Sequence, residues 1–278
     1  MEKEKMNKKG RKIKIVFISI IIILFGCTAS FGVYEVATRN NEYYISEKNI
    51  QIPVFVYHDI VEDESQIEYD YMQTTYDQFK KQIDGLMNLG YKPISYEDLV
   101  AYSKGEKKLP KWSFLITFDD GYTGVYKYAY EYAKEKNIPI TSFINNVNVG
   151  KTGFYSWEEA KEMNDSGVVS VYSHGYEHLE YNKYSPDKLL EDTNKAYDEI
   201  EANLEDEDIL KVFTYPYGLY TEEELQTLKE AGYVQNLTDN KINESKSLNL
   251  YGLHRCYPLS DSVAKIIIKI QYRAIRYN

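Results

Sequence analysis

The amino-acid sequence predicts one α/β domain built on a parallel sheet, in the form of a closed or distorted barrel. Short apolar runs of strand length alternate along the chain with longer amphipathic stretches, and this alternation is typical of strand–helix–strand units. Ser or Thr stands at the start of several amphipathic stretches, where it can cap a helix. The length of this part of the chain favours a barrel over an open sheet, and no internal repeat or second domain is found.

The apolar runs are predicted to be buried strands, because they are short and rich in β-branched and aromatic residues. These strands are expected at residues 54–57, 114–118, 140–144, 168–172, 212–215 and 233–237. The amphipathic stretches are predicted to be helices that cover the sheet. These helices are expected at residues 76–89, 96–103, 125–136, 157–164, 186–203 and 222–231.

The N-terminal region carries an uncharged apolar segment, residues 15–33, directly after a basic stretch. A helix of this length, at about 1.5 Å per residue, would cross a hydrocarbon core of about 30 Å. The positive-inside rule keeps the N-terminus in the cytoplasm and places the domain outside the cell. A cleaved signal peptide and a lipoprotein signal ending at Cys27 are the alternatives, although Phe25 fits lipoprotein cleavage poorly. The sequence therefore predicts a cytoplasmic segment 1–14, a single-pass membrane anchor 15–34, a linker 35–50 and an extracellular domain 51–278.

Charge and cysteine content exclude two classes of protein. The net charge is −10, and because residues 1–14 contribute +5, the remainder carries −15. Nucleic acid is therefore not an expected partner, since phosphate binding needs a basic surface. The two cysteines are Cys27, in the apolar segment, and Cys256, so the domain has no disulfide framework.

Polar residues stand directly after several of the predicted strands. They are His58 and Asp59, Asp119 and Asp120, His174 and His178, and Tyr217 and Gly218. The C-terminal ends of barrel strands form the active-site face, so we expect these residues to meet on one rim.

His174 and His178 stand four residues apart and, with Asp120, form a candidate three-ligand metal site. Two imidazoles, one carboxylate and an open position suit a catalytic Zn²⁺. A pair of surface or capping histidines is the alternative for an isolated HxxxH pattern. Two adjacent carboxylates at a half-buried strand end need a compensating cation or proton. With Asp120 on the metal, Asp119 is a candidate general base towards the metal-bound water. A solvated Asp-Asp-Gly turn is the alternative.

The segment FTYPYG at residues 213–218 places a rigid turn after a predicted strand. The backbone N–H of Tyr217 could stabilise an oxyanion there, as attack of water on a carbonyl requires. Taken alone, this segment indicates only a turn.

The segments TFDDGY (117–122), SHGYEH (173–178) and FTYPYG (213–218), in this order, resemble the polysaccharide deacetylase family. The family is also called the NodB-homology domain or carbohydrate esterase family 4. The resemblance covers about residues 51–278 and implies a distorted (β/α) barrel. It also implies that the substrate is an N-acetylated polysaccharide, from which acetyl is removed at N-acetylglucosamine units.

The resemblance further implies a role for each matching residue. Asp119 would be the general base, while Asp120, His174 and His178 would bind a divalent metal, usually zinc. The amide of Tyr217 would face the tetrahedral intermediate.

Two features of the family pattern are missing, and both concern proton transfer. The arginine that many members place shortly before the Pro-Tyr-Gly turn, where it steadies the base, is absent. The late Leu-x-His motif that normally supplies the general acid is also absent, because Leu253 and His254 are adjacent.

Residues 52–59, IPVFVYHD, resemble instead the opening strand of the subgroup that deacetylates exopolysaccharide poly-N-acetylglucosamine. In that subgroup the motif order looks circularly permuted, and an early histidine takes the place of the acid. His58 is therefore our candidate for protonating the leaving amine. A structural histidine at a strand end, with His254 as the acid, is the alternative.

The sequence thus predicts a membrane-tethered, extracellular, metal-dependent deacetylase of a cell-surface polysaccharide. Exopolysaccharide poly-N-acetylglucosamine is favoured as substrate, and peptidoglycan is the alternative. A non-catalytic glycan-binding protein of the same fold would be expected to lack a ligand or the base. A phosphodiesterase would be expected to add basic side chains, and Arg255 is the only arginine near any motif.

Overall fold

The computed structural model describes residues 50–258 and 260–276, and all of them belong to one compact unit. The main sheet has eight strands in the order β12-β10-β9-β8-β7-β6-β2, with β5 beside β6, and neighbouring strands are parallel. The strands are β2 (Val54–Tyr57), β5 (Lys92–Pro93), β6 (Ser113–Phe118), β7 (Ile140–Ile144), β8 (Val169–Ser173), β9 (Val212–Thr214), β10 (Val234–Leu237) and β12 (Leu253–His254).

The two ends of this sheet meet, which makes it a nearly closed barrel. Cys256, just after β12, pairs in parallel with Phe55 of β2. The Val56 N–H donates to the Cys256 carbonyl at 3.0 Å, and the Cys256 N–H donates to the Val54 carbonyl at 2.9 Å. The predicted α/β fold with a barrel-like parallel sheet is confirmed.

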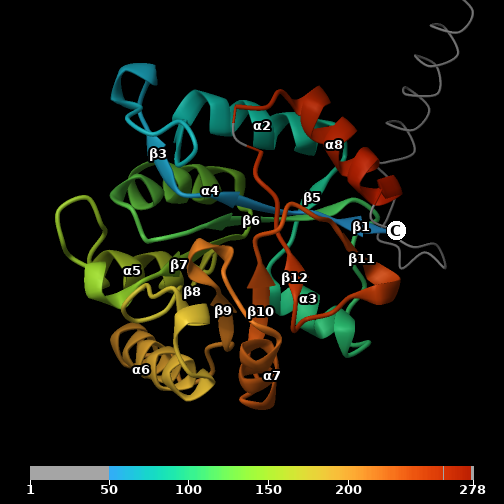
Figure 1. Cartoon of the computed structure of the whole chain (residues 1–278). Coiled ribbons are helices and arrows are strands. Elements are labelled where there is room, and N and C mark those ends of the chain that lie inside the picture. The colour runs from blue at the N-terminus through green and yellow to red at the C-terminus, as the bar shows by residue number, and fades with distance from the viewer. Residues whose placement is uncertain (1–49, 259, 277–278) are drawn as a thin grey trace, which may run out of the picture. The chain divides into compact units, whose positions relative to one another are not determined.

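Helices cover the outside of the sheet (Figure 1). They are α2 (Tyr76–Asn88), α3 (Tyr96–Ser103), α4 (Glu131–Lys136), α5 (Trp157–Asp165), α6 (Pro186–Leu204), α7 (Glu222–Glu230) and α8 (Val263–Arg276). Side chains of the N-cap residues accept backbone hydrogen bonds as predicted, for example Ser95 from Asp98 and Ser156 from Glu159. The predicted helix 125–136 is divided, because a π-helical turn (Val125–Tyr130) precedes α4.

Several elements were not predicted from the sequence. Two small pairs flank the main sheet: β1 (Gln51–Ile52) with β11 (Asn243–Glu244), and β3 (Asp59–Val61) with β4 (Gln73–Thr75). Strands this short have no readable periodicity. Helix α8 was also not predicted. It buries Ile266 and Ile270 and lies beside α2.

The core is aromatic, and it includes Tyr57 and Phe118, the last residues of β2 and β6. Strands β2, β6 and β7 are buried at every position, as expected for parallel strands covered on both faces. Tyr57, Phe79, Phe118 and Tyr132 form one continuous ring cluster with centroid distances of 5.2–5.6 Å. Residues placed directly after these strands therefore have well-defined positions.

No helix in the described part of the chain is long and apolar enough to cross a membrane. The predicted cytoplasmic segment 1–14 and the predicted anchor 15–34 lie outside the described residues, as does the predicted linker except for Ile50. The anchor therefore stays a prediction.

Candidate active site

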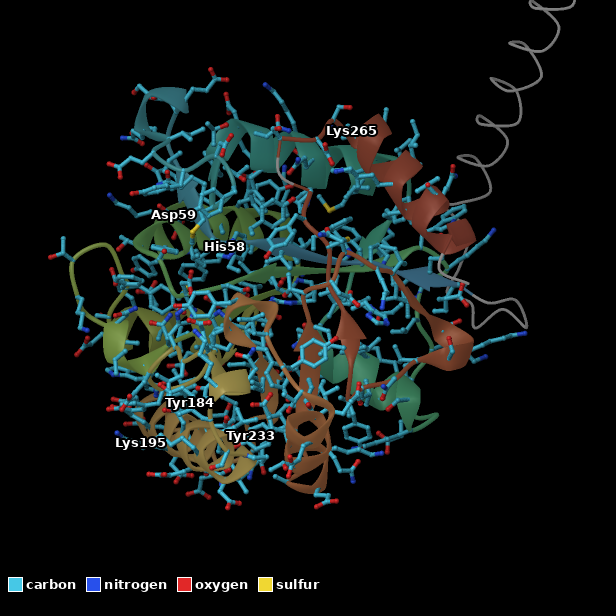
Figure 2. All side chains as sticks on the ribbon, viewed as in Figure 1. His58, Asp59, Tyr184, Lys195, Tyr233 and Lys265 are labelled. Carbon is cyan, nitrogen blue, oxygen red and sulfur yellow. The ribbon has the colours of Figure 1, made fainter. Side chains whose placement is uncertain are left out.

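The C-terminal ends of the barrel strands converge on one cavity of about 470 Å³. Every predicted site residue lines it, namely His58, Asp119, Asp120, His174, His178 and Tyr217. His58 follows β2 (Figure 2), the two aspartates follow β6, His174 follows β8, and Tyr217 lies in the turn after β9. Asp59, in contrast, begins β3, and its carboxylate accepts a hydrogen bond from Gln73 Nε2 at 3.3 Å.

Asp120, His174 and His178 form one compact cluster. Oδ1 of Asp120 lies 3.3 Å from Nε2 of His178 and 3.6 Å from Nε2 of His174. The three ligand atoms lie within 4.8 Å of one another, so one ion could contact all three.

The surroundings of His174 prepare it for metal binding. Its Nδ1 lies 2.9 Å from the carbonyl oxygen of Thr214, and because a carbonyl can only accept, we assign the proton to Nδ1. Nε2 is then unprotonated and faces Asp120. Burial lowers the pKa of His174 to about 4, against the opposing effect of the two aspartates. The imidazole is therefore neutral near pH 7, as a metal ligand must be.

The carboxylate of Asp120 is also held in place. Asn145 Nδ2 donates to Oδ1 at 3.3 Å. Burial raises the pKa of Asp120, but the contacts with His178 and His174 outweigh it and leave the pKa below its usual value. An ionised carboxylate with two neutral imidazoles is the donor set of catalytic zinc sites that keep further positions for water and substrate, so the three residues fit a divalent metal.

Asp119 is paired with an arginine that the sequence analysis did not connect to it. Nη1 and Nη2 of Arg255 donate to Oδ1 and Oδ2 of Asp119 at 2.7 and 2.8 Å, and the arginine side chain is 0% exposed. Nη2 also donates to Thr238 Oγ1 at 2.8 Å. This is the bidentate geometry that orients a carboxylate most strictly.

Arg255 corrects two interpretations of the sequence. Both aspartates are buried, so the solvated Asp-Asp-Gly turn is wrong, and the cation that compensates Asp119 is Arg255. Burial raises the pKa of Asp119, but the adjacent guanidinium outweighs this effect and lowers the pKa to about 2. A steadying arginine is thus present, although it comes from the segment after β12. The neighbouring His254 has a different partner, Asp239.

The two remaining histidines of the chain occupy different places. The His58 ring lines the catalytic cavity and stacks on Tyr257, with a centroid distance of 6.1 Å and an interplanar angle of 2°. Nδ1 of His254 lies 2.8 Å from Asp239 Oδ2. The His254 side chain lines another cavity, of about 320 Å³. Of these two candidates for the acid, His58 is the one that shares the cavity with Asp119.

The turn after β9 brings Tyr217 to the wall of the cavity. Tyr217 has a left-handed backbone with φ of 59°, and its ring centroid lies 4.7 Å from that of His178. The turn is closed by the Gly218 N–H, which donates to the Tyr215 carbonyl at 3.1 Å. No hydrogen bond from the Tyr217 N–H is found within the described residues, so this amide can serve a ligand.

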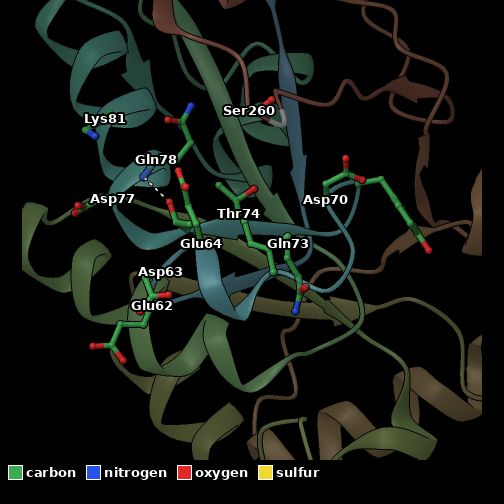
Figure 3. A pocket seen from close by; sticks show the side chains of 13 residues that line it. Glu62, Asp63, Glu64, Asp70, Gln73, Thr74, Asp77, Gln78, Lys81 and Ser260 are labelled. Carbon is green, nitrogen blue, oxygen red and sulfur yellow. Dashed lines mark hydrogen bonds between the residues drawn. The ribbon is translucent and has the colours of Figure 1, made fainter.

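A second, larger cavity of about 650 Å³ adjoins the catalytic one, and Figure 3 shows it. Tyr71 lines both cavities. The charged residues of its lining are Glu62, Asp63, Glu64, Asp70, Asp77 and Lys81. The space beside the catalytic cavity is therefore an open, mainly acidic groove.

Comparison with known proteins gives relatives of one kind. A family model described as polysaccharide deacetylase matches residues 106–235. YxkH of Bacillus subtilis (strain 168), which carries the provisional name of polysaccharide deacetylase, is 29% identical over 213 residues, covering 76% of this chain and 72% of YxkH. The poly-beta-1,6-N-acetyl-D-glucosamine N-deacetylase of Staphylococcus aureus (strain MRSA252) is 29% identical over 205 residues, or 69% of each chain.

Solved structures share the fold over most of the chain. IcaB from Ammonifex degensii is 25% identical with a TM-score of 0.68, over 80% of this chain and 97% of IcaB. The Streptococcus pyogenes deacetylase PplD, solved in complex with acetate, is 23% identical with a TM-score of 0.71, over 80% of this chain and 99% of PplD. The family model, the relatives and the fold agree with the resemblance seen in the motifs: the chain belongs to the polysaccharide deacetylase family and is a hydrolase acting on amide bonds.

Proposed function

We propose that the protein removes acetyl groups from N-acetylglucosamine units of a cell-surface polysaccharide, with exopolysaccharide poly-N-acetylglucosamine as the favoured substrate. The observation that carries this proposal is the shared cavity, which is lined by Asp119, by the Asp120–His174–His178 cluster and by His58. Arg255 holds Asp119 from behind this lining. The similarity to a poly-beta-1,6-N-acetyl-D-glucosamine N-deacetylase supports the choice of substrate.

Asp120, His174 and His178 would hold a divalent cation, for which we propose Zn²⁺. When bound, the ion would act as a Lewis acid that polarises the acetyl carbonyl. The bound His174 and Asp120 would need no change of protonation state near pH 7, since both already have the required form.

The chain's own groups would carry the protons of the reaction. Asp119, kept ionised and oriented by Arg255, would accept a proton as water adds to the acetyl carbon. The Tyr217 N–H would donate to the developing oxyanion. His58 would give its proton to the nitrogen as the C–N bond breaks, which yields acetate and a glucosamine unit.

The shape of the surface supports a polymeric substrate. Tyr71 and Tyr217, which line the catalytic cavity, are 60% and 63% exposed, and exposed aromatic faces can pack against sugar rings. The adjoining groove extends the opening beyond Tyr71. Its acidic lining would tolerate glucosamine units, which are cationic at neutral pH.

We also propose that residues 15–34 anchor the protein in the cell membrane, with the catalytic domain outside. The uncharged apolar segment after a basic stretch supports this placement. The full-length protein should stay in the membrane fraction, and its domain should be cleaved by protease added to intact cells. A shortened, freely secreted product would instead indicate signal cleavage.

An acetate-release assay tests the proposed reaction. The full-length chain in detergent would be stripped of metal, supplied with Zn²⁺, and given poly-N-acetylglucosamine or peptidoglycan. We expect release from the exopolysaccharide only when Zn²⁺ is present. Release from peptidoglycan alone would reassign the substrate, and no release from either polymer would contradict the function.

A further inference from the structure

The loop that carries both histidine ligands has an unusual backbone. Gly175 has φ of 85° and His178 has φ of 56°. Left-handed backbone is unfavourable for a residue with a side chain, and it persists only where the surroundings impose it. The position of His178 therefore depends on contacts elsewhere that keep this loop in shape.

Those contacts come from a buried carboxylate on helix α6. Oδ2 of Asp192 accepts a hydrogen bond from the Tyr176 N–H at 2.7 Å, and another from the Tyr181 hydroxyl. Asp192 is 2% exposed and Tyr181 is 0% exposed. Tyr176 lies midway between His174 and His178, so Asp192 is hydrogen-bonded to the centre of the loop that carries both histidines.

The same groups explain the glycine in the loop. A Cβ at position 175 would collide with the Tyr181 hydroxyl and would lie 3.4 Å from Asp192 Oδ2. The loop thus packs directly on the hydroxyl that Asp192 holds. Two further bonds complete the arrangement: the Gly175 N–H donates to Ser173 Oγ, and the Val147 N–H donates to the Tyr176 carbonyl, each at 3.1 Å.

The Asp192 carboxylate has no cationic partner in the described part of the chain. Among the described residues no Lys, Arg or His forms an ion pair with Asp192; the nearby Lys195 (Figure 2) lies instead over the Tyr176 ring, 3.5 Å from its centroid. A buried carboxylate held only by neutral donors is costly. An apolar residue would fill the place without this cost but could not hold the Tyr176 amide.

We propose that Asp192 and Tyr181 are positioning residues of the metal site: they hold residues 173–178 in the shape that brings His178 to Asp120, and so set the affinity for divalent metal. This inference rests on the metal site of the proposed function. Neither residue touches the ligand atoms, so their effect should show in metal affinity and vanish when metal is saturating.

The test is a Zn²⁺ titration of the full-length chain in detergent, in competition with a chromophoric chelator. Asp192→Ala should weaken Zn²⁺ binding about 10- to 100-fold, the usual effect of losing a group that supports a metal ligand. Asp192→Asn should have an intermediate effect, because its amide oxygen can still accept from Tyr176. Asp198→Ala, which removes an exposed carboxylate of the same helix, should leave the affinity unchanged.

Thermal unfolding of the metal-free variants separates positioning from a general loss of stability. Acetate release by Asp192→Ala should return to nearly the wild-type kcat at saturating Zn²⁺. A lower unfolding temperature with unchanged Zn²⁺ affinity would overturn the inference.

If Asp192→Ala does not fold, the variant Tyr181→Phe provides the test, because it keeps the ring and removes only the hydroxyl. Zn²⁺ binding by Tyr181→Phe should weaken several-fold, and an unchanged affinity would overturn the inference.

The wild-type titration distinguishes this inference from the proposed function. Wild-type protein that binds no Zn²⁺ would overturn the metal site and the inference with it. Wild-type protein that binds Zn²⁺ and releases acetate, with equal affinity in the variants, would overturn the inference alone.

Discussion

The two halves of the catalytic cavity are assembled in different ways. Asp120, His174 and His178 come from β6 and the loop after β8, which are separated by one strand of the sheet. His58 and Arg255 come from the two ends of the sheet order, after β2 and after β12, and meet near Asp119 only because the barrel closes. The proposed metal site therefore depends on a local loop, whereas the proposed proton-transfer groups depend on closure of the whole fold.

The largest expected effect concerns the proposed metal site. His178→Ala should abolish both bound metal and activity, since a three-ligand site loses one ligand. The fold should survive, because the His178 side chain is 23% exposed and lies in a loop. Metal analysis and circular dichroism check this prediction, and full metal occupancy in the variant would show that the ligand assignment is wrong.

Asp119→Asn should keep the metal yet lower turnover about 10²- to 10⁴-fold, the typical contribution of a general base. The variant should also be less stable, because a neutral partner leaves the buried Arg255 charge uncompensated. Zinc content, kcat and the unfolding temperature should be measured together. Near-normal turnover would refute the role of Asp119.

The two histidines outside the proposed metal site, His58 and His254, are expected to differ in their effect on turnover. His58→Ala should retain metal and lose about 10²-fold or more in kcat, whereas His254→Ala should stay close to wild type, because its ring pairs with Asp239 outside the catalytic cavity. The pH–rate profile of His58→Ala should also lose its alkaline limb, which would report deprotonation of the acid. The reverse result, with His254→Ala inactive, would show that the segment after β12 supplies the acid.

A smaller loss of turnover than in Asp119→Asn or His58→Ala is expected from Arg255→Lys, which keeps the charge and removes the bidentate geometry. Loss of one charge-assisted hydrogen bond, worth at least about 1.5 kcal/mol, should lower turnover on the order of 10-fold, with metal retained. Since Arg255 lowers the pKa of Asp119, a weaker contact should raise that pKa. The base must be ionised, so the acidic limb of the kcat/KM profile should move to higher pH, and an unmoved limb would contradict the coupling.

The sequence predicted the main strands and helices well, because each carries a local signal. Strands 54–57 and 140–144 and helix 96–103 match the structure to the residue, since their apolar runs and capping residues lie within a few positions of one another. The π-helical turn before α4 was not predicted, because it has the same apolar pattern as an ordinary helix.

The contact of Arg255 with Asp119 could not be predicted from the local sequence. It follows β12, a strand of two residues, which is too short to reveal which side chain faces inward. His254 is only partly buried, while the next residue is fully buried against Asp119. An arginine in a short apolar segment, GLHRCYPL, was the one available sign, since a buried guanidinium needs an anionic partner.

By itself the sequence determined the family, the alternation of strands and helices, and the residues able to bind a metal, because each of these depends on short motifs or local periodicity within contiguous segments. Only the tertiary structure decided which cation faces Asp119, which histidine shares its cavity, and which carboxylate holds the ligand loop. These contacts join Asp119 to Arg255 and Tyr176 to Asp192 across separate segments, and they arise from closure of the barrel and packing of α6, which no local pattern encodes.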